Sequence, residues 1–157
     1  MKPLVFGILC SMGLAMATGA AAADAQLAAP IHQFVDSFNK GDLKAAAATH
    51  SADVAIIDEV APYLWRGPGA FQAWSGALVA DAQKRGLTDM SVALGEPVRE
   101  EVSGDHGYVV MQATYSFKDH GAAMREPAQM TFALNKEAAG WRISGWTWSG
   151  PKPQPAK

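Results

Sequence analysis

The sequence predicts one α+β domain in which about three N-terminal helices cover one face of a curved, mostly antiparallel sheet. Helical signals are grouped before residue 87, and alternating strand signals are grouped after it. Neither an internal repeat nor a linker separates the two halves. Helices and strands that are segregated along a chain are typical of a helical layer packed on a sheet. We place this domain at residues 24–150.

The first 23 residues have the pattern of a secretory signal peptide. Lys2 supplies a positive charge, residues 4–9 are apolar, and small residues lead to an A-x-A site at residues 21–23. The apolar stretch is too short to span a bilayer comfortably. We therefore expect cleavage after Ala23, a periplasmic or secreted mature chain of about 134 residues, and no membrane attachment after cleavage.

Composition narrows the class of partner. Cys10 lies inside the predicted signal peptide, so the mature chain has no cysteine for a disulfide or a thiolate site. Without Lys2 the chain has twelve basic and fifteen acidic residues, a net charge of about −3. Weak acidity without a basic patch argues against nucleic acid or an anionic membrane as a partner.

Helical periodicity begins near Asp24. In this first helix, apolar residues recur at the i, i+3, i+4, i+7 spacing of a helix with one buried face. These residues are Ile31, Phe34, Val35 and Phe38. We expect Pro30 at a first turn or a kink, and Gly41 at the end of the helix. Asp42 is then the predicted N-cap of a short helix from Leu43 to about His50.

A strand from Asp53 to Glu59 and a short extended segment at residues 63–66 are predicted next. The sequence at residues 67–69, Gly-Pro-Gly, opens a third helix that ends with a basic residue and Gly86. The apolar stripe of this helix is Phe71, Trp74, Leu78 and Ala82.

The second half of the chain predicts an antiparallel meander of about four long strands, because apolar and polar residues alternate along it. The four segments are 90–102, 107–118, 128–135 and 141–149. Pro97 implies an edge strand or a bulge, and residues 119–121 form a hairpin turn. The proline-rich residues 151–157 are expected to form a flexible, solvated tail that does not join the sheet.

Two segments, FVDSFNKGDL at residues 34–43 and ADVAIID at residues 52–58, resemble the NTF2-like superfamily. The resemblance is to its SnoaL-like and ketosteroid-isomerase-like branch, including small exported domains, and covers roughly residues 26–150. It implies a cone, in which a strongly bent sheet wraps the helices and leaves an apolar cavity with a mouth. It also implies a homodimer formed through the sheet face.

The resemblance places Asp58 at the position of the isomerase's catalytic aspartate. Four apolar residues lead into Asp58 and Glu59, so a buried strand delivers an acidic side chain to the edge of the core. An apolar pocket raises the pKa of a carboxylate and makes it a better proton acceptor at neutral pH. The alternative is that Asp58 caps the strand end or pairs with Arg66.

The same alignment shows two departures from the isomerase. Phe34 falls at the position of the family's oxyanion tyrosine and has no donor, and Gln129 falls at that of its protonated aspartate. Losing one oxyanion donor costs ~3 kcal/mol of transition-state stabilisation, so efficient steroid isomerisation is not expected. Gln129 either orients a ligand carbonyl or is an exposed polar residue on a half-buried strand.

Further side chains complete the predicted pocket. Large aromatic residues such as Trp65 line apolar cavities well. Tyr63, Tyr108 and Tyr115 are candidates to replace the missing phenol, and Arg66 either meets an anionic ligand or forms a salt bridge at the rim. The predicted ligand-binding set is Phe34, Tyr63, Trp65, Arg66, Tyr115 and Gln129.

The histidines do not predict a metal site. His32 and Asp36 have the i, i+4 spacing of two ligands, but no third ligand can be assigned, and an exposed polar helix face explains the pair. His50, His106 and His120 are expected to be solvated, because they fall at a helix end or in turns. We expect neither a metal nor another cofactor.

The sequence is compatible with two functions. The first is an exported domain that binds a small, largely apolar molecule in the cone, with Asp58 as a general base of the isomerase or hydratase (lyase) kind. The second is a non-catalytic module of the same fold that binds a ligand or a protein, including a second copy of itself. Phe34 and Gln129 favour the second.

Overall fold

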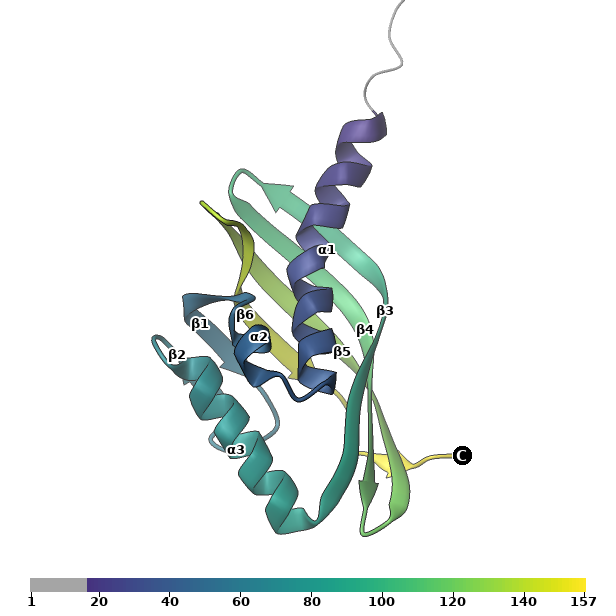
Figure 1. Ribbon diagram of the computed structural model, residues 1–157. Helices are drawn as coiled ribbons and strands as arrows, with labels where there is room; N and C mark the ends of the chain where they lie inside the picture. Colours follow the sequence, from purple (N-terminus) through teal and green to yellow (C-terminus); the bar gives the residue numbers. More distant parts are fainter. Residues whose placement is uncertain (1–16) are drawn as a thin grey trace, which may run out of the picture.

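The computed structural model of the protein describes residues 17–157, with side chains from residue 26 onward. Its helices are α1 (Ala17–Asn39), α2 (Leu43–Ala47) and α3 (Ala70–Arg85). Its strands are β1 (His50–Ile57), β2 (Leu64–Arg66), β3 (Leu87–Ser103), β4 (His106–Asp119), β5 (Ala122–Glu137), β6 (Gly140–Ser149) and β7 (Gln154–Pro155). The predicted order of helices, short strands and a long meander is confirmed (Figure 1).

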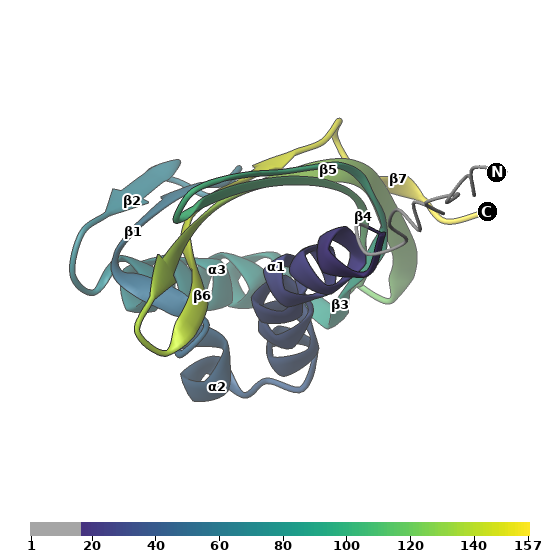
Figure 2. The same cartoon turned by 90° about the horizontal axis from the view of Figure 1, so that it is seen from above.

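The sheet is strongly curved and mostly antiparallel, as predicted. Its strand order is β2-β1-β6-β5-β4-β3, and β1 and β6 form its one parallel pair. Figure 2 shows the sheet arching over α1 and α3, so that the helices fill its concave side. In edge strand β3 the register shifts on both sides of Pro97. This irregularity agrees with the bulge predicted there, and bulges bend a strand and increase its twist.

Helix α1 is longer than expected, because it begins at Ala17 rather than near Asp24. Pro30 lies inside the helix, so the prediction of a first-turn position is wrong. The predicted apolar stripe is confirmed, since Ile31, Phe34 and Val35 are buried and Phe38 is half-buried. The stripe therefore fixes which face of α1 meets the sheet.

The predicted signal peptide is not tested by the structure. Its residues 1–16 lie outside the described residues, so the peptide and the cleavage after Ala23 stay predictions. Among residues 17–157, no helix has both the length and the apolar character needed to cross a membrane.

Short-range capping explains the two shorter helices. The Asp42 carboxylate accepts a hydrogen bond from the Ala45 N–H at 2.9 Å, which confirms Asp42 as the N-cap of α2. Helix α2 ends at Ala47, earlier than predicted, and His50 is the first residue of β1. Helix α3 ends at Arg85 and is followed by Gly86, whose φ of 68° is the left-handed conformation expected of a C-capping glycine.

The main core lies between the helices and the concave face of the sheet. Each large apolar side chain that is fully buried there stabilises the fold by ~1.5–3 kcal/mol. The most completely buried are Leu27, Ile31, Val54, Ile56, Val109, Met111, Phe132, Leu134 and Ile143. Because they come from α1, β1, β4, β5 and β6, they hold both walls of the cone together.

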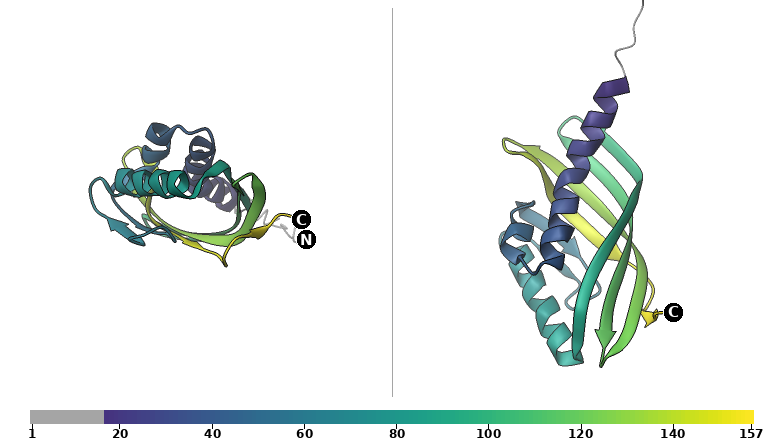
Figure 3. Two further views of the ribbon diagram at one scale, coloured as in Figure 1. Left: turned by 90° about the horizontal axis from the view of Figure 1, so that it is seen from below. Right: turned by 45° about the vertical axis from the view of Figure 1, so that its right-hand side comes forward.

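The C-terminal tail corrects one prediction. Residues 154–155 form β7, which pairs with Met124 and Arg125 at the start of β5, and the Ala156 N–H donates to the Ala123 carbonyl at 2.9 Å. The expectation that the tail stays outside the sheet is therefore wrong. Proline is tolerated at the edge of a sheet, where its missing N–H breaks no ladder. Figure 3 shows the C-terminus beside the β4–β5 hairpin.

Candidate functional site

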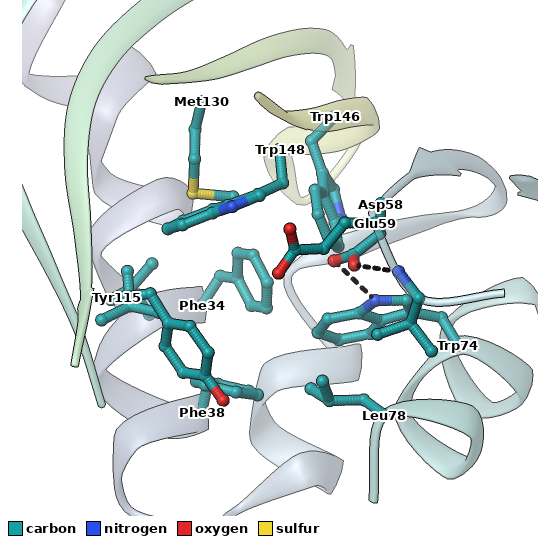
Figure 4. A pocket seen from close by; sticks show the side chains of 13 residues that line it. Phe34, Phe38, Asp58, Glu59, Trp74, Leu78, Tyr115, Met130, Trp146 and Trp148 are labelled. Carbon is teal, nitrogen blue, oxygen red and sulfur yellow. Dashed lines mark hydrogen bonds between the residues drawn. The ribbon is translucent and has the colours of Figure 1, made fainter. Parts of the chain in front are cut away.

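An apolar cavity of about 60 Å³ lies between α1, α3 and the sheet. Its helical wall is Phe34, Val35, Phe38, Trp74 and Leu78, and its sheet wall is Val92, Tyr115, Met130, Trp146 and Trp148. Two acidic residues and Val60 enter from the loop after β1 (Figure 4). An apolar cavity of ~150 Å³ accommodates benzene, so this cavity holds a few waters or part of one aromatic ring, and a bound ring extends toward the mouth.

A wider and more polar groove of about 490 Å³ adjoins this cavity. Glu59 and Val60 line both spaces. Its polar and charged lining comes from the β1–β2 loop, α3, the end of β4 and the tail: Tyr63, Asp81, Arg85, Asp119 and Lys152. Glu59 therefore stands where the apolar cavity opens toward solvent.

Asp58 is the first residue after β1, and it is fixed by two hydrogen bonds. Its Oδ1 accepts from the Val60 N–H, and its Oδ2 accepts from the Trp74 indole N–H, both at 3.0 Å. Burial raises the pKa of Asp58, and these two hydrogen bonds offset part of that rise. Asp58 thus lines the cavity and also caps the end of its strand, while none of the ion pairs among the described residues joins it to Arg66.

Glu59 presents the freer carboxyl group. The residue is exposed at the mouth, yet its carboxyl points into the cavity beside that of Asp58 (Figure 4). Burial, together with the negative charges of Glu126 and Asp58, raises the pKa of Glu59 to about 7. A carboxyl group with this pKa exchanges its proton readily at neutral pH.

Glu126 is a third acid, placed behind the cavity wall on β5. Its side chain is fully buried, and its Oε1 accepts a hydrogen bond of 2.7 Å from the Trp148 indole N–H. Burial raises the pKa of Glu126, and the hydrogen bond from Trp148 opposes this rise.

Tyr115 offers a hydrogen-bond donor on the opposite side of the cavity. Its hydroxyl oxygen is buried and has no hydrogen-bond partner among the described residues. Burial raises the pKa of Tyr115 to about 12, so the phenol keeps its proton at neutral pH. Figure 4 shows the hydroxyl pointing toward Phe38 and Leu78, away from the two carboxyl groups.

The structure brings only part of the predicted ligand-binding set to the cavity. Phe34 and Tyr115 line it together with Asp58. Trp65 is instead buried in the core, and Arg66 is exposed on β2. Trp65 was predicted because aromatic residues line apolar cavities well, and Arg66 because of its charge. Neither property decides the direction of a side chain.

Gln129 and Tyr63 also lie elsewhere. Gln129 is exposed on the convex face of the sheet, because its neighbour Met130 is buried on the concave face and successive side chains alternate. Of the two interpretations of Gln129, the exposed polar residue is therefore correct. Tyr63 is 61% exposed and lines the outer groove.

The sequence indicated no role for Glu59 or Glu126. Glu59 carried the same signal as Asp58, an acid at the end of an apolar run. Glu126 fell in a segment interpreted as a connection, because the strand was predicted to begin at residue 128. Trp74 was predicted as core; it is buried, and it also lines the cavity and holds Asp58.

Among the histidines, His50 contradicts the prediction that it is solvated. Its Nε2 accepts from the Trp146 indole N–H at 3.1 Å, which leaves the proton on Nδ1, 3.0 Å from the Ala46 carbonyl. Burial lowers the pKa of His50 to about 4. His106 and His120 are exposed, as predicted.

His32 and Asp36 are exposed on α1. Within residues 17–157, no group of three or more histidine, cysteine or acidic side chains could hold a metal ion.

His50 should make the protein sensitive to acid. A neutral histidine with a lowered pKa contributes stability that is complete above its unfolded pKa of 6.5 and is lost as the pH falls toward 4. The shift corresponds to about 3 kcal/mol in the free energy of unfolding. Urea unfolding at pH 7 and at pH 4 measures this loss. Between these two pH values, the free energy of unfolding of the wild type should fall by about 3 kcal/mol more than that of His50→Gln.

The exposed His32→Gln is the matched control for this measurement, and it should follow the wild type at both pH values. If the free energies of unfolding of the wild type and His50→Gln changed equally between pH 7 and pH 4, the interpretation of His50 as a buried neutral histidine would be wrong.

Comparisons with solved structures agree with this fold. A hexachlorocyclohexane dehydrochlorinase from Novosphingobium barchaimii superposes with a TM-score of 0.73 at 15% identity, covering 88% of this chain and 93% of its own. A ketosteroid isomerase-like protein from Erwinia carotovora atroseptica superposes with a TM-score of 0.63 at 22% identity, covering 82% of this chain and 96% of its own. An NTF2-like superfamily protein from Salmonella enterica superposes with a TM-score of 0.66 at 17% identity, covering 90% of this chain and 95% of its own. Identities this low establish the fold alone.

No curated protein matches the chain. The family model of the SnoaL-like domain matches residues 27–153, which include every element of the cone except the first part of α1 and the last residues of the tail. The chain belongs to the SnoaL-like family and has the NTF2-like cone fold.

Proposed function

We propose that this protein binds a small, largely apolar molecule in the cavity and that Glu59, beside Asp58, removes a proton from it. The observation that carries this proposal is that two carboxyl groups with raised pKa values enter an otherwise apolar cavity. Apolar pockets with a few convergent polar groups are typical ligand sites, and perturbed carboxyl groups within them are typical catalytic acids and bases.

Glu59 is the better candidate for the base. A general base works best when its pKa lies near the working pH, and the pKa of Glu59 is about 7. Asp58 already accepts two hydrogen bonds from the protein, so its oxygens are held in place. Its negative charge contributes to the raised pKa of Glu59.

The names of the solved neighbours support a reaction that begins with proton removal from carbon. In an elimination, Glu59 takes the proton, the C–H electron pair forms a C=C bond, and a leaving group such as chloride departs with its electrons. In an isomerisation, the electron pair moves toward a carbonyl group, and Glu59 returns the proton to another carbon. Tyr115 lines the cavity and its hydroxyl has no hydrogen-bond partner among the described residues, which supports it as the proposed donor to an oxygen or halogen of the ligand.

The size of the cavity limits the substrate. One ring already exceeds the closed part, so the ring and any longer substituent extend past Glu59 into the outer groove. Candidate substrates are therefore small cyclic enones, lactones, epoxides and halogenated rings. Fused ring systems such as steroids exceed the closed space.

Binding can be tested with a one-ring probe such as bromobenzene. Because three tryptophans line the cavity, saturable quenching of tryptophan fluorescence is expected. Leu78→Phe fills the cavity and should weaken binding at least tenfold. Val79→Phe, at the adjacent residue of α3, which is 40% exposed, should leave binding unchanged. Equal affinities in these two variants would contradict binding in the cavity.

The alternative function is ligand binding without turnover. The two hydrogen bonds of Asp58 favour it, because they give this carboxylate a structural role.

Export of the mature chain and a homodimer through the convex sheet face are further proposals. N-terminal sequencing of exported protein and sedimentation of the mature chain test them.

A further inference from the structure

Glu126 is unusual because a carboxyl group with no exposed surface sits in an apolar wall. Burying an ionised carboxylate is costly unless hydrogen bonds or an opposite charge compensate it. Its Oε1 receives the Trp148 N–H at 2.7 Å, whereas its Oε2 is buried without an amide, indole or hydroxyl donor among the described residues. One half of this carboxyl group therefore needs a proton or a protonated neighbour.

Glu59 is that neighbour. A hydrogen bond between the two carboxyl groups acts on them in opposite directions, because it raises the pKa of Glu59 and opposes the rise in the pKa of Glu126. Two carboxyl groups in contact cannot both ionise without strong repulsion, so such a pair holds one proton between its members.

The other charges around the pair do not remove this constraint. Asp58 adds a further negative charge, and Tyr115 is neutral. Arg85, on α3, is the cation that acts on both glutamates, and it is already paired with Asp81 at 3.2 Å. Beyond Glu59 the groove is lined by Asp81, Asp119 and Lys152. The positive charges nearby therefore do not neutralise three carboxylates.

We propose that Glu126 is a positioning residue of this site, which shares one proton with Glu59 and thereby sets the proton affinity of the base. Its catalytic meaning rests on the function proposed above. Glu126 does not line the cavity, so it acts through Glu59 and not on the ligand. The sharing lets Glu59 accept a proton from a substrate and release it again.

The segments around Glu126 shield its side chain from solvent. Glu126 lies opposite Tyr115 in the β4–β5 ladder, and Trp148 reaches it from β6. Gly150, directly after β6, packs so closely that a Cβ there would overlap with Oε1 of Glu126. The tail then returns to pair with Met124 and Arg125, beside Glu126 on β5. The tail thus lies beside the part of β5 that carries Glu126.

The proposal can be tested by carbon-13 NMR of the whole protein labelled at the glutamate carboxyl carbons. In the wild type, Glu59 and Glu126 should titrate in two coupled steps, one of them near neutral pH. Glu126→Gln removes the repulsion and should make Glu59 at least tenfold more acidic, a fall of one pH unit or more in its midpoint. Glu96→Gln, an exposed glutamate on β3, is the matched control.

A second variant keeps the test decisive if Glu126→Gln does not fold. Trp148→Phe removes the donor to Oε1, so the proton moves toward Glu126 and Glu59 again becomes more acidic. A Glu59 midpoint that stays near 4.3 in the wild type, or that is unchanged in the foldable variants, would overturn the proposal. Any pH profile of turnover should shift by the same amount as the Glu59 midpoint.

These titrations need no substrate. The shared proton can therefore be refuted while ligand binding stands, and ligand binding can be refuted while the shared proton stands. The two ideas fail in separate experiments.

Discussion

Replacing Glu59 with glutamine is expected to reduce turnover by a factor of about 10²–10⁴, the usual contribution of a positioned general base. The amide has nearly the same shape and cannot accept the proton. Because the apolar wall is unchanged, the affinity for a one-ring ligand should stay nearly the same. The measurement is kcat and Kd for the wild type and the variant with a substrate from the panel named above.

Asp58→Asn tests the role of Asp58 separately from that of the adjacent Glu59. Its Oδ1 still accepts from Val60, but its amide nitrogen cannot accept from Trp74, so some stability is lost. Removing the Asp58 charge lowers the pKa of Glu59, and turnover should therefore persist with a pH profile shifted to lower pH.

The outcomes of the two substitutions identify the base. If Asp58→Asn abolishes turnover and Glu59→Gln does not, Asp58 is the base that the sequence alignment indicated. If apolar probes bind but no substrate in the panel is converted, the protein is the non-catalytic module. Glu96→Gln should match the wild type throughout, because Glu96 is exposed and distant in sequence from both acids.

Phe34→Ala should cost about 3–5 kcal/mol in the free energy of unfolding, the largest stability effect that we expect from a single substitution. The Phe34 ring is 3% exposed and contacts five aromatic rings. These belong to Phe38, His50, Phe71, Trp74 and Trp146, with centroids 4.8–6.5 Å away. A typical domain has only ~5–15 kcal/mol of total stability, so this variant should be close to unfolding.

Urea unfolding followed by circular dichroism measures this loss. Tyr63→Ala removes a larger side chain at a position that is 61% exposed and should change stability by less than ~0.5 kcal/mol. A loss below ~1 kcal/mol in Phe34→Ala would mean that the aromatic cluster is not the centre of the core. Benzene should partly restore stability, because the substitution enlarges an apolar cavity that a ring can fill.

Local signals were sufficient to predict the elements of the fold. The i, i+3, i+4 stripe of α1 identified the buried face, and Asp42, Gly41 and Gly86 marked helix ends. These signals depend on residues a few positions apart, so one sequence contains them. The tail failed as a prediction because proline content predicts only that β7 is a poor strand, and not that β5 offers it an unpaired edge.

The candidate site was predictable only where it depends on sequence neighbours. Asp58 follows an apolar strand, which the sequence shows directly. Glu126 and Trp148 meet because β5 and β6 pair in one particular register, and no local pattern specifies that register. The sequence contained conflicting signals for Gln129. Its alternation with Met130 indicated that the two side chains lie on opposite faces of the sheet. The family alignment instead placed Gln129 at the cavity, where the structure does not have it.

The most direct test of the central claim is a crystal structure of the mature protein soaked with bromobenzene, in which anomalous scattering locates the bromine. We expect one bromine inside the cavity, bordered by Trp74, Trp148 and Tyr115, with the ring beside the carboxyl group of Glu59. A bromine found only in the outer groove, or a cavity that excludes the ring, would contradict it.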